Sequence, residues 1–433
     1  MRIYDLREGG DRGPLRSAFA DRLSPAAADA GDEVVVREIL ADVSRRGDAA
    51  VLERTRRYDF PEATTLRVPD EAVLSAVKRV ETTSLWEAMN LAASRIRSFH
   101  EKHRRESWLT LSDPGETLGQ VIRPLSRVGV YVPGGTAAYP STVLMAAIPA
   151  NVAGVRSIAL ATPPSRETGL PPDATLAAAF LAGVSEIYAM GGAQAIGALA
   201  YGTASVPPVV KIVGPGNRYV NTAKRLVYGV VGIDMLAGPS EVGVIADDTA
   251  SARTIAIEII AQTEHDPLNS AFLATTSHTL ANEVRREIDS QLADLPRADV
   301  VRAALESFGF IAVVDAIPDA VDVMNEYAPE HLHLLTTDPW GIVPMIENAG
   351  AILIGESSAA ALGDYLAGPC HTLPTSGSAR FSSPLNVDDF TKKTSIIALD
   401  GACAIRLAPA AVTFARAEGL EAHARSANHA LER

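Results

Sequence analysis

The stretch RVGVYVP, Arg127–Pro133, decides the fold, because it is a short apolar run that ends at Gly134 and Gly135 and leads into an alanine-rich segment. The same texture recurs in SIALATPP, EIYAMGG, PVVKIVGPGN and EVGVIAD. A second series follows with AFLATTS, FIAVVDA, HLHLLTT and GAILIGES. Short strands that alternate with helical segments are typical of βαβ units. The sequence therefore predicts an α/β protein with two halves, each built on a parallel sheet.

Helical segments are expected on both sides of this region. Residues 32–103 carry apolar side chains at helical spacing, which predicts a helical front end. The closing stretch PAAVTFARAEGLEAHARSANHALER predicts a charged helix that packs on this chain or on a partner.

Length and composition narrow the classes of function. The 433 residues suffice for two or three domains. A net charge of -13 argues against nucleic acid as a partner, because phosphate binding needs a basic surface. Cys370 and Cys403 are too few for a disulfide framework, so we expect a reducing compartment, the cytoplasm. We expect neither secretion nor membrane insertion, because the start lacks the apolar core of a signal peptide and the most apolar stretch is too short to span a bilayer.

Three glycine-containing turns each follow a predicted strand and precede a predicted helix. They are Gly134–Gly135, MGGAQAIGALAYG and KIVGPGNRYVNTAK. The ends of parallel strands collect ligands, and helix N-termini bind phosphate, so the three turns together favour a nucleotide. Alternatively, the glycines serve only positive φ angles and tight packing.

Gln262 and His265 lie three residues apart near the end of a predicted helix that Pro267 must terminate soon after Asp266. Their side chains share one face, where they can converge on a metal. Glutamine is an unusual zinc ligand, however, and a histidine near a helix C-terminus often interacts only with the helix dipole. The spacing alone favours this second interpretation.

Two further sets of residues carry weaker signals. Asp364 and His371 flank a Gly-Pro turn in a loop of the kind that holds functional sites, although a capping aspartate and an exposed histidine are the simpler interpretation. Glu418 and His423 lie five residues apart on the predicted terminal helix. Taken alone, they are typical of a solvated surface.

The segment NEYAPEHLHLL, Asn325–Leu335, places the carboxylate of Glu330 beside the imidazole of His331. A neutral imidazole takes up a proton near pH 7, and a carboxylate can activate water. Adjacent strand residues point to opposite faces, so both can serve one pocket only if the chain turns there, as Pro329 suggests. An exposed glutamate and a structural histidine are an equally good interpretation of this segment.

Nine ordered blocks resemble the histidinol dehydrogenase family over nearly the whole chain. They are RVGVYVPGG, YPSTVLM, MGGAQAI, KIVGPGNRYV, GIDMLAGPSE, AQTEHDP, YAPEHL, GDYLAGPCHTLPTSGSARFSSPL and EGLEAH. The resemblance implies a zinc- and NAD-dependent enzyme that oxidises L-histidinol through the aldehyde to L-histidine, in the last two steps of histidine biosynthesis. It also implies a homodimer in which the C-terminal segment completes the neighbouring site.

The expected architecture consists of two incomplete Rossmann-like domains with small helical terminal segments. Residues 26–130 and 238–385 form the first domain, which carries the metal and catalytic residues, and residues 131–237 form the NAD-binding domain. Residues 1–25 form the N-terminal segment, and residues 386–433 form the tail.

The resemblance also assigns residues to roles. Zinc is expected on Gln262, His265, Asp364 and His423, and catalysis on Glu330 and His331. Substrate binding is expected from Ser240, His371 and Glu418, together with the four zinc ligands and His331. Nucleotide contacts are expected from Tyr131, Gln194 and Asn217.

The sequence departs from the family in two places. Cys370 stands where asparagine is common, and GESSAAALGDY lacks a frequent Pro-Glu pair. Three alternatives are a paralogous zinc- and NAD-dependent dehydrogenase acting on another small alcohol or diol, a zinc hydrolase that uses Glu330 to activate water, and a silent nucleotide-binding scaffold.

Overall fold

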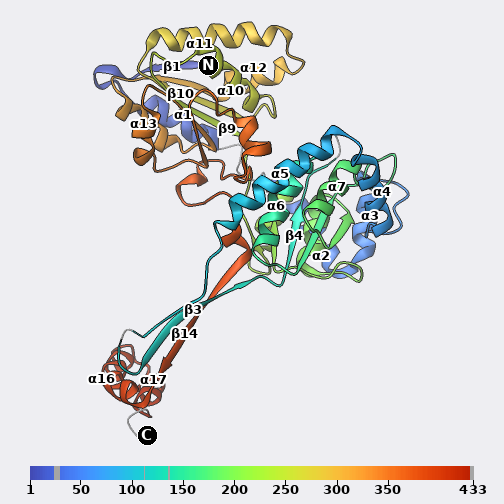
Figure 1. Ribbon diagram of the computed structural model, residues 1–433, viewed down its shortest axis with the longest axis vertical. Helices are drawn as coiled ribbons and strands as arrows, with labels where there is room; N and C mark the ends of the chain where they lie inside the picture. The colour runs from blue at the N-terminus through green and yellow to red at the C-terminus, as the bar shows by residue number, and fades with distance from the viewer. Residues whose placement is uncertain (24–29, 112, 135–136, 430–433) are drawn as a thin grey trace.

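The computed structural model describes residues 1–23, 30–111, 113–134 and 137–429. Figure 1 shows two α/β domains, with a long arm that carries the C-terminal helices away from both. Among the described residues, no helix is both long and apolar enough to cross a membrane. Gly135 lies outside the described residues.

A five-stranded parallel sheet forms the core of one domain, in the order β6-β5-β4-β7-β8. Its strands are β4 (Arg127–Tyr131), β5 (Ser157–Thr162), β6 (Glu186–Ala189), β7 (Lys211–Val213) and β8 (Gly232–Ile233). The order reverses between β4 and β7, which is the point where such sheets bind ligands outside the carboxyl ends of their strands.

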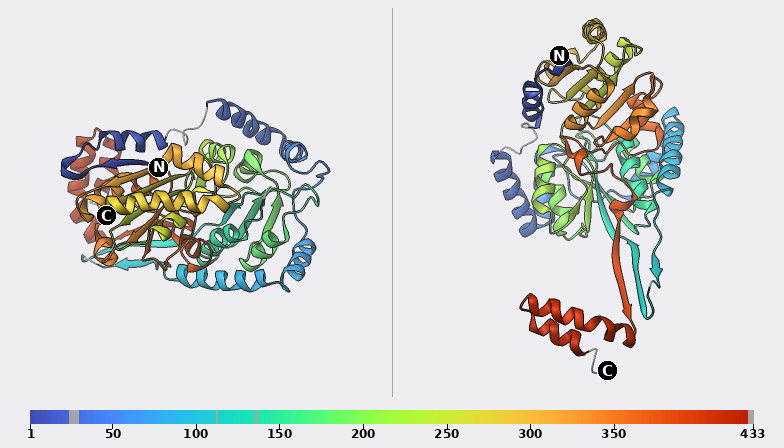
Figure 2. Two further views of the ribbon diagram at one scale, coloured as in Figure 1. Left: turned by 90° about the horizontal axis from the view of Figure 1, so that it is seen from above. Right: turned by 90° about the vertical axis from the view of Figure 1, so that its left-hand side faces the viewer.

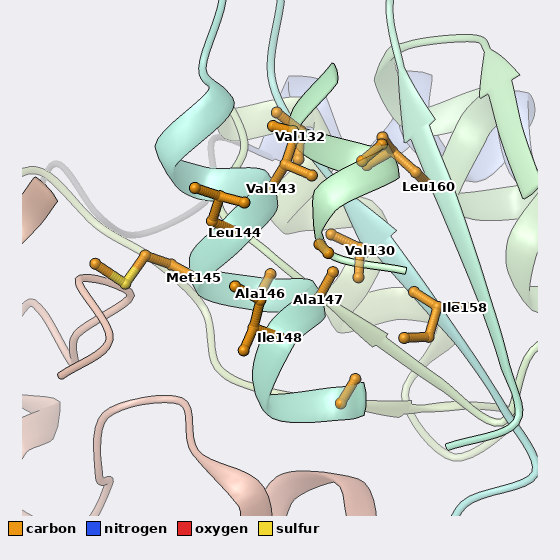
Figure 3. Close-up of a cluster of buried hydrophobic side chains, with 14 of the residues drawn as sticks. Val130, Val132, Val143, Leu144, Met145, Ala146, Ala147, Ile148, Ile158 and Leu160 are labelled. Atoms are coloured by element: carbon orange, nitrogen blue, oxygen red, sulfur yellow. The ribbon is translucent and has the colours of Figure 1, made fainter. Parts of the chain in front are cut away.

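Helices cover both faces of this sheet. One face carries α4 (Asp70–Val80), α5 (Ser84–Glu101), α6 (Pro140–Val152) and α7 (Asp173–Leu181). The other carries α2 (Ala30–Arg46), α3 (Asp48–Tyr58), α8 (Gly192–Tyr201) and α9 (Arg218–Val227). In Figure 3, Val143 and Ala147 of α6 lie toward Val130 and Ile158 of the sheet.

The helices of residues 30–101 correct the predicted domain boundary. The predicted ranges place residues 26–130 in the domain that also holds 238–385, but α2 to α5 pack on α6 to α9, the helices that cover the sheet containing β4. Their buried apolar side chains, such as Leu40 of α2 and Ile96 of α5, join the cores that include α8 and α6. Helical periodicity shows that a face is apolar but not which sheet it covers, so the sequence pattern could not decide this point.

A six-stranded parallel sheet forms the core of the other domain, in the order β1-β11-β10-β9-β12-β13. Its strands are β1 (Arg2–Asp5), β9 (Glu241–Ala246), β10 (Ser270–Thr275), β11 (Gly309–Val313), β12 (His331–Leu335) and β13 (Ala351–Ile354). Apart from β1, the order again reverses after the first three strands, as in a Rossmann-like sheet. The expected fold class is confirmed. The N-terminal segment, however, also supplies the edge strand β1.

Helices also cover both faces of the six-stranded sheet. One face carries α10 (Ala252–Thr263), α11 (His278–Gln291) and α12 (Ala298–Phe308). The other carries α1 (Gly13–Leu23), α13 (Ile317–Tyr327) and α14 (Pro339–Ile342).

The arm is a three-stranded antiparallel sheet that the sequence pattern did not predict. It consists of β2 (Trp108–Thr110), β3 (Glu116–Pro124) and β14 (Thr391–Leu399). Beyond it lie α16 (Gly401–Ala417) and α17 (Glu421–Asn428), which pack on each other. The predicted single terminal helix is therefore two helices, separated at Gly419, whose φ of 74° ends the first. Figure 1 and the right view of Figure 2 both place this helix pair at the far end of the arm.

We predict that Gly243→Ala destabilises the six-stranded domain. A Cβ on Gly243 would lie 2.6 Å from the Met324 sulfur and 2.9 Å from Cγ of Pro329, in the turn before Glu330. Overpacking of this kind costs about 1–3 kcal/mol of unfolding free energy. Urea unfolding measures the loss. Gly232→Ala is the control, because that strand glycine has no neighbour closer than 3.5 Å to the added carbon. Equal stability of the two variants would contradict the prediction.

Candidate functional site

The predicted nucleotide contacts lie at the carboxyl ends of the five-stranded sheet. Tyr131 ends β4, and its buried hydroxyl oxygen accepts a hydrogen bond from the Gly192 N–H at 3.1 Å. Burial raises the pKa of Tyr131 to about 12, so its phenol stays protonated. Gln194 is buried in the first turn of α8. Asn217 is exposed, and its side chain caps α9 by accepting from the N–H groups of Tyr219 and Val220.

A buried ion pair fixes the turn between β7 and α9. Lys224 Nζ lies 2.5 Å from Asp234 Oδ1 and donates to the carbonyl of Gly214 at 2.9 Å. Asp234 Oδ2 in turn accepts from the Gly214 N–H at 2.7 Å. Gly214 has a φ of 111° and leaves no room for a Cβ, which would lie 2.1 Å from the carbonyl oxygen of Tyr131. The glycine is therefore required here by its conformation and by close packing.

Glu330 and His331 lie at the amino end of β12 in the six-stranded sheet, whereas the predicted nucleotide contacts lie at the carboxyl ends of strands in the five-stranded sheet. Ala328 adopts a left-handed conformation at the end of α13, with a φ of 53°, and Pro329 follows. This turn brings Glu330 Oε2 to 3.8 Å from His331 Nδ1. The expectation that the chain turns here is confirmed, and both side chains lie on one side of it.

The Glu330 carboxylate is buried, and its Oε2 accepts the backbone N–H of Glu241 at 3.0 Å. Burial raises the pKa of Glu330 to about 7, although the His331 charge and the hydrogen bond from Glu241 oppose the rise. The group is therefore poised near neutral pH, where general bases are most effective.

His331 also contacts the loop that carries Asp364. Its Nε2 lies 3.0 Å from Asp364 Oδ1. Burial by itself lowers the pKa of His331, but the bond to Asp364 and the charge of Glu330 raise it above its usual value. Asp364 lies in a π-helical turn, Gly363–Ala367, directly after the short helix α15 (Ala360–Leu362). Single π-helical turns often occur at functional sites.

His371 joins this cluster through the same loop. Its Nδ1 lies 2.9 Å from the carbonyl oxygen of Asp364, and burial lowers its pKa. Burial raises the pKa of Asp364, but the bond from His331 and the charges of His331, His371 and His265 lower it below its usual value. The structure thus brings together four predicted residues: Glu330, His331, Asp364 and His371.

Gln262 and His265 lie at the end of α10. The helix ends at Thr263, earlier than predicted, so Gln262 is in its last turn and His265 lies just beyond it. Gln262 is 4% exposed, yet its side-chain amide makes no hydrogen bond to any described residue. His265 is exposed. Ser240 precedes β9, where its backbone N–H donates to Asn269 Oδ1 at 2.9 Å.

Glu418 and His423 are not near the other predicted site residues of the same chain. Glu418 follows α16 and His423 lies in α17, at the far end of the arm (Figure 1). Across the described ranges, no three His, Cys, Asp or Glu side chains form a metal-binding group. A side-chain amide that makes no hydrogen bond to a described residue, together with imidazole and carboxylate donors, suits zinc or a similar divalent ion. The described residues of one chain therefore fit part of such a site and lack the ligand on the arm.

Cys370 is packed away from this chemistry. Its thiol is buried and donates to the carbonyl of Met145 in α6 at 3.4 Å. In Figure 3, Met145 extends away from the strands. Burial raises the pKa of Cys370 to about 12, whereas a nucleophilic cysteine needs a thiolate near neutral pH.

Several supporting residues were not singled out from the sequence. Arg22 of α1 lies 3.3 Å from Glu241 and stacks over Tyr327, and Glu258 of α10 lies 3.4 Å from His333. Sequence spacing could have identified two of these residues. Glu258 is one helical turn before Gln262, and His333 shares a strand face with His331. Arg22 had none, because its partners lie more than two hundred residues away.

Comparisons with known proteins agree with one another. A family model described as histidinol dehydrogenase matches residues 24–431. The histidinol dehydrogenase of Geobacter sulfurreducens is 47% identical over 438 residues, which covers 100% of both chains. That of Moorella thermoacetica is 51% identical over 393 residues, which covers 90% of this chain and 92% of the other. The crystal structure of histidinol dehydrogenase from Elizabethkingia anophelis matches with a TM-score of 0.91 and 34% identity, and covers 100% of this chain and 98% of that one.

Two Rossmann-like sheets, with glycine turns at the carboxyl ends of one and an acid–imidazole pair at the amino end of the other, define an α/β protein of the Rossmann-like class, and the family match identifies it as an oxidoreductase. The chain belongs to the histidinol dehydrogenase family.

We predict that Glu330→Gln stabilises the folded protein at high pH. An acid whose folded pKa is raised contributes stability below its unfolded pKa, and that stability is lost as the pH rises through the folded value. The shift from 4.5 to about 7 corresponds to roughly 3 kcal/mol. Urea unfolding should therefore show an advantage of the variant that grows between pH 5 and pH 8, as an order-of-magnitude expectation. An advantage that is the same at every pH would contradict it.

Proposed function

We propose that this protein oxidises L-histidinol through L-histidinaldehyde to L-histidine with NAD, in the last two steps of histidine biosynthesis. One observation carries the proposal: the turn at Ala328 places Glu330 against His331, which also contacts Asp364. An acid and a base held together suit a site that runs two different oxidations. The named relatives, which are histidinol dehydrogenases, support the same substrate.

The proposed metal ligands are Gln262, His265 and Asp364 of one chain and the partner subunit's His423. Zinc bound there would orient the substrate's imidazole and amino nitrogens, acting as a template rather than as a source of hydroxide. The lowered pKa of Asp364 keeps its carboxylate ionised for such a role.

His331 is assigned the proton of the alcohol. Its Nε2 faces Asp364 and therefore the proposed ligand set. Because Nε2–H donates to the ionised Asp364, the ring takes up the proton at Nδ1. The resulting imidazolium is stabilised by Asp364 on one side and by Glu330 on the other, which is why the pKa of His331 is raised. The nicotinamide, held near Tyr131, Gln194 and Asn217, would accept a hydride in each of the two oxidations.

Glu330 is assigned the second step. With a pKa of about 7 it can remove a proton from water as the aldehyde becomes its hydrate, and His331 then assists hydride loss from that hydrate. A thiol route would need an ionised cysteine beside the substrate. Cys370 does not meet this need, because its thiol is buried with a pKa of about 12.

Ser240, His371 and Glu418 are proposed to hold the substrate's polar groups, Glu418 from across a dimer. The position of α16 and α17 at the far end of the arm supports the proposed homodimer, because Glu418 follows α16 and His423 lies in α17, away from the two domains of their own chain (Figure 1). A cytoplasmic location belongs to the same proposal.

We predict that Glu330→Gln separates the two oxidations. Loss of a general base slows its step by about 10²–10⁴-fold. Oxidation of added L-histidinaldehyde should fall by this factor, while the first hydride transfer, followed as NADH formed in a single turnover from L-histidinol, changes far less. Glu326→Gln is the control, because the Glu326 carboxylate pairs with Arg12 and Arg16 at the surface. An equal loss of rate in both oxidations would contradict the role of Glu330 as the general base of the second one.

We predict that two variants that are each defective in oxidising L-histidinaldehyde restore this reaction when they are refolded together. His423→Asn and Glu330→Gln each disable a site for this reaction. If His423 acts across the dimer, a hybrid dimer has one site with both changes and one site with neither. Random pairing should recover about a quarter of wild-type activity for a symmetric dimer. If His423 acted within its own chain, every site of the hybrid would stay defective and mixing would recover nothing.

A further inference from the structure

Three separate elements must be held in register to form the proposed metal site. Gln262 lies in the last turn of α10, His331 begins β12, and Asp364 lies in the π-helical turn after α15. These elements are distant in sequence. Ligands must be held within about 0.5 Å of the productive geometry to bind a metal well. The structure should therefore contain a contact that joins all three.

Glu258 supplies such a contact. Its Oε2 accepts the backbone N–H of Ala360 at 3.0 Å, and the same oxygen lies 3.4 Å from Nε2 of His333. The approach to His333 is not aligned as a hydrogen bond, and Nε2 has no other partner among the described residues. One carboxylate oxygen therefore faces groups from both of the other elements.

The positions of these groups relate directly to the site. Glu258 precedes Gln262 by four residues, so the two lie one turn apart on the same side of α10. His333 follows His331 by two residues and shares its face of β12. Ala360 opens the short helix that leads into Asp364. A shift of Glu258 would be transmitted to each element that carries a ligand or catalytic group.

Packing alone does not require a carboxylate here. Ile255 and Ile259 of α10 already lie in the apolar core of the sheet. Glu258 is 6% exposed and His333 1% exposed, so both polar groups have been removed from water. Apolar side chains of similar volume are often equally or more stable at such positions. The polar contacts of the carboxylate are directional, so they fix the relative positions of the elements, which apolar contacts do not do.

We infer that Glu258 is a positioning residue for the metal site, holding α10, β12 and the Asp364 turn in register through Ala360 and His333. The inference rests on the proposed function, because it assumes that zinc binds Gln262, His265 and Asp364. The assigned role of Glu258 is to position the ligands, not to bind the metal or the substrate. Partners of this kind affect metal affinity by about 10–100-fold when they are changed.

The test compares zinc affinity among variants of the full-length protein, using competition with a chromophoric chelator. Glu258→Met keeps the volume and removes both polar contacts. It should bind zinc at least about tenfold more weakly than wild type, and its cobalt-substituted form should show a changed visible absorption spectrum. Glu258→Gln keeps an acceptor for the Ala360 N–H but loses the charge. Its zinc affinity should therefore lie between those of wild type and Glu258→Met.

Thr263→Val is the matched control. Thr263 is buried on the same helix, and its hydroxyl donates only to its own helix, to the carbonyl of Ile259 at 2.7 Å and that of Ile260 at 3.4 Å. This variant should keep wild-type zinc affinity and the wild-type cobalt spectrum.

Each outcome decides the inference. If Glu258→Met loses stability yet keeps wild-type zinc affinity and cobalt spectrum, Glu258 is only structural and the inference is overturned. If Glu258→Met does not fold, Glu258→Gln decides: weaker zinc binding supports the role, and wild-type binding overturns it. If wild-type protein itself binds no zinc, the proposed metal site fails and this inference fails with it, a result distinct from failure of the positioning role alone.

Discussion

The hydrogen bond from the backbone N–H of Glu241 to the carboxylate of Glu330 is the interaction on which the site depends. It joins the amino ends of β9 and β12, the two neighbouring strands at which the order of the six-stranded sheet reverses. Glu330 is held in a buried position, where its pKa rises to about 7, and His331 is held beside it. Arg22 lies 3.3 Å from the buried side chain of Glu241, so its positive charge offsets the negative charge of the Glu241 carboxylate next to this hydrogen bond.

The two domains use opposite ends of their sheets. The nucleotide-type turns lie at the carboxyl ends of β4, β6 and β7, as is usual for parallel sheets. The acid–imidazole pair lies at the amino end of β12 and depends on a left-handed residue and a proline to turn the chain. Gly243 leaves the space that Pro329 fills. The arm adds a third element, because it carries α16 and α17, and with them Glu418 and His423, away from the two domains (Figure 1).

Much of the fold was predictable from local sequence pattern, because nine short apolar runs each became a strand of a parallel sheet. The packing of α2 to α5 and the antiparallel arm were not predictable, because both depend on contacts between segments distant in sequence. Similarly, residue type identified Glu330 and His331 as candidates but left an ordinary interpretation open. Glu330 is buried rather than exposed, which excludes that part of the ordinary interpretation, and the catalytic role stays a proposal. The roles of Gln262, His265 and His423 in metal binding still rest on the family resemblance.

The most direct measurement is the number of NADH molecules formed for each L-histidinol consumed, run to completion with zinc, repeated after chelation and again after zinc is restored. The proposed function requires two NADH per L-histidinol, lost on chelation and recovered with zinc. One NADH would mean that the reaction ends at the aldehyde and that Glu330 has no second step to serve. No NADH would contradict L-histidinol as the substrate.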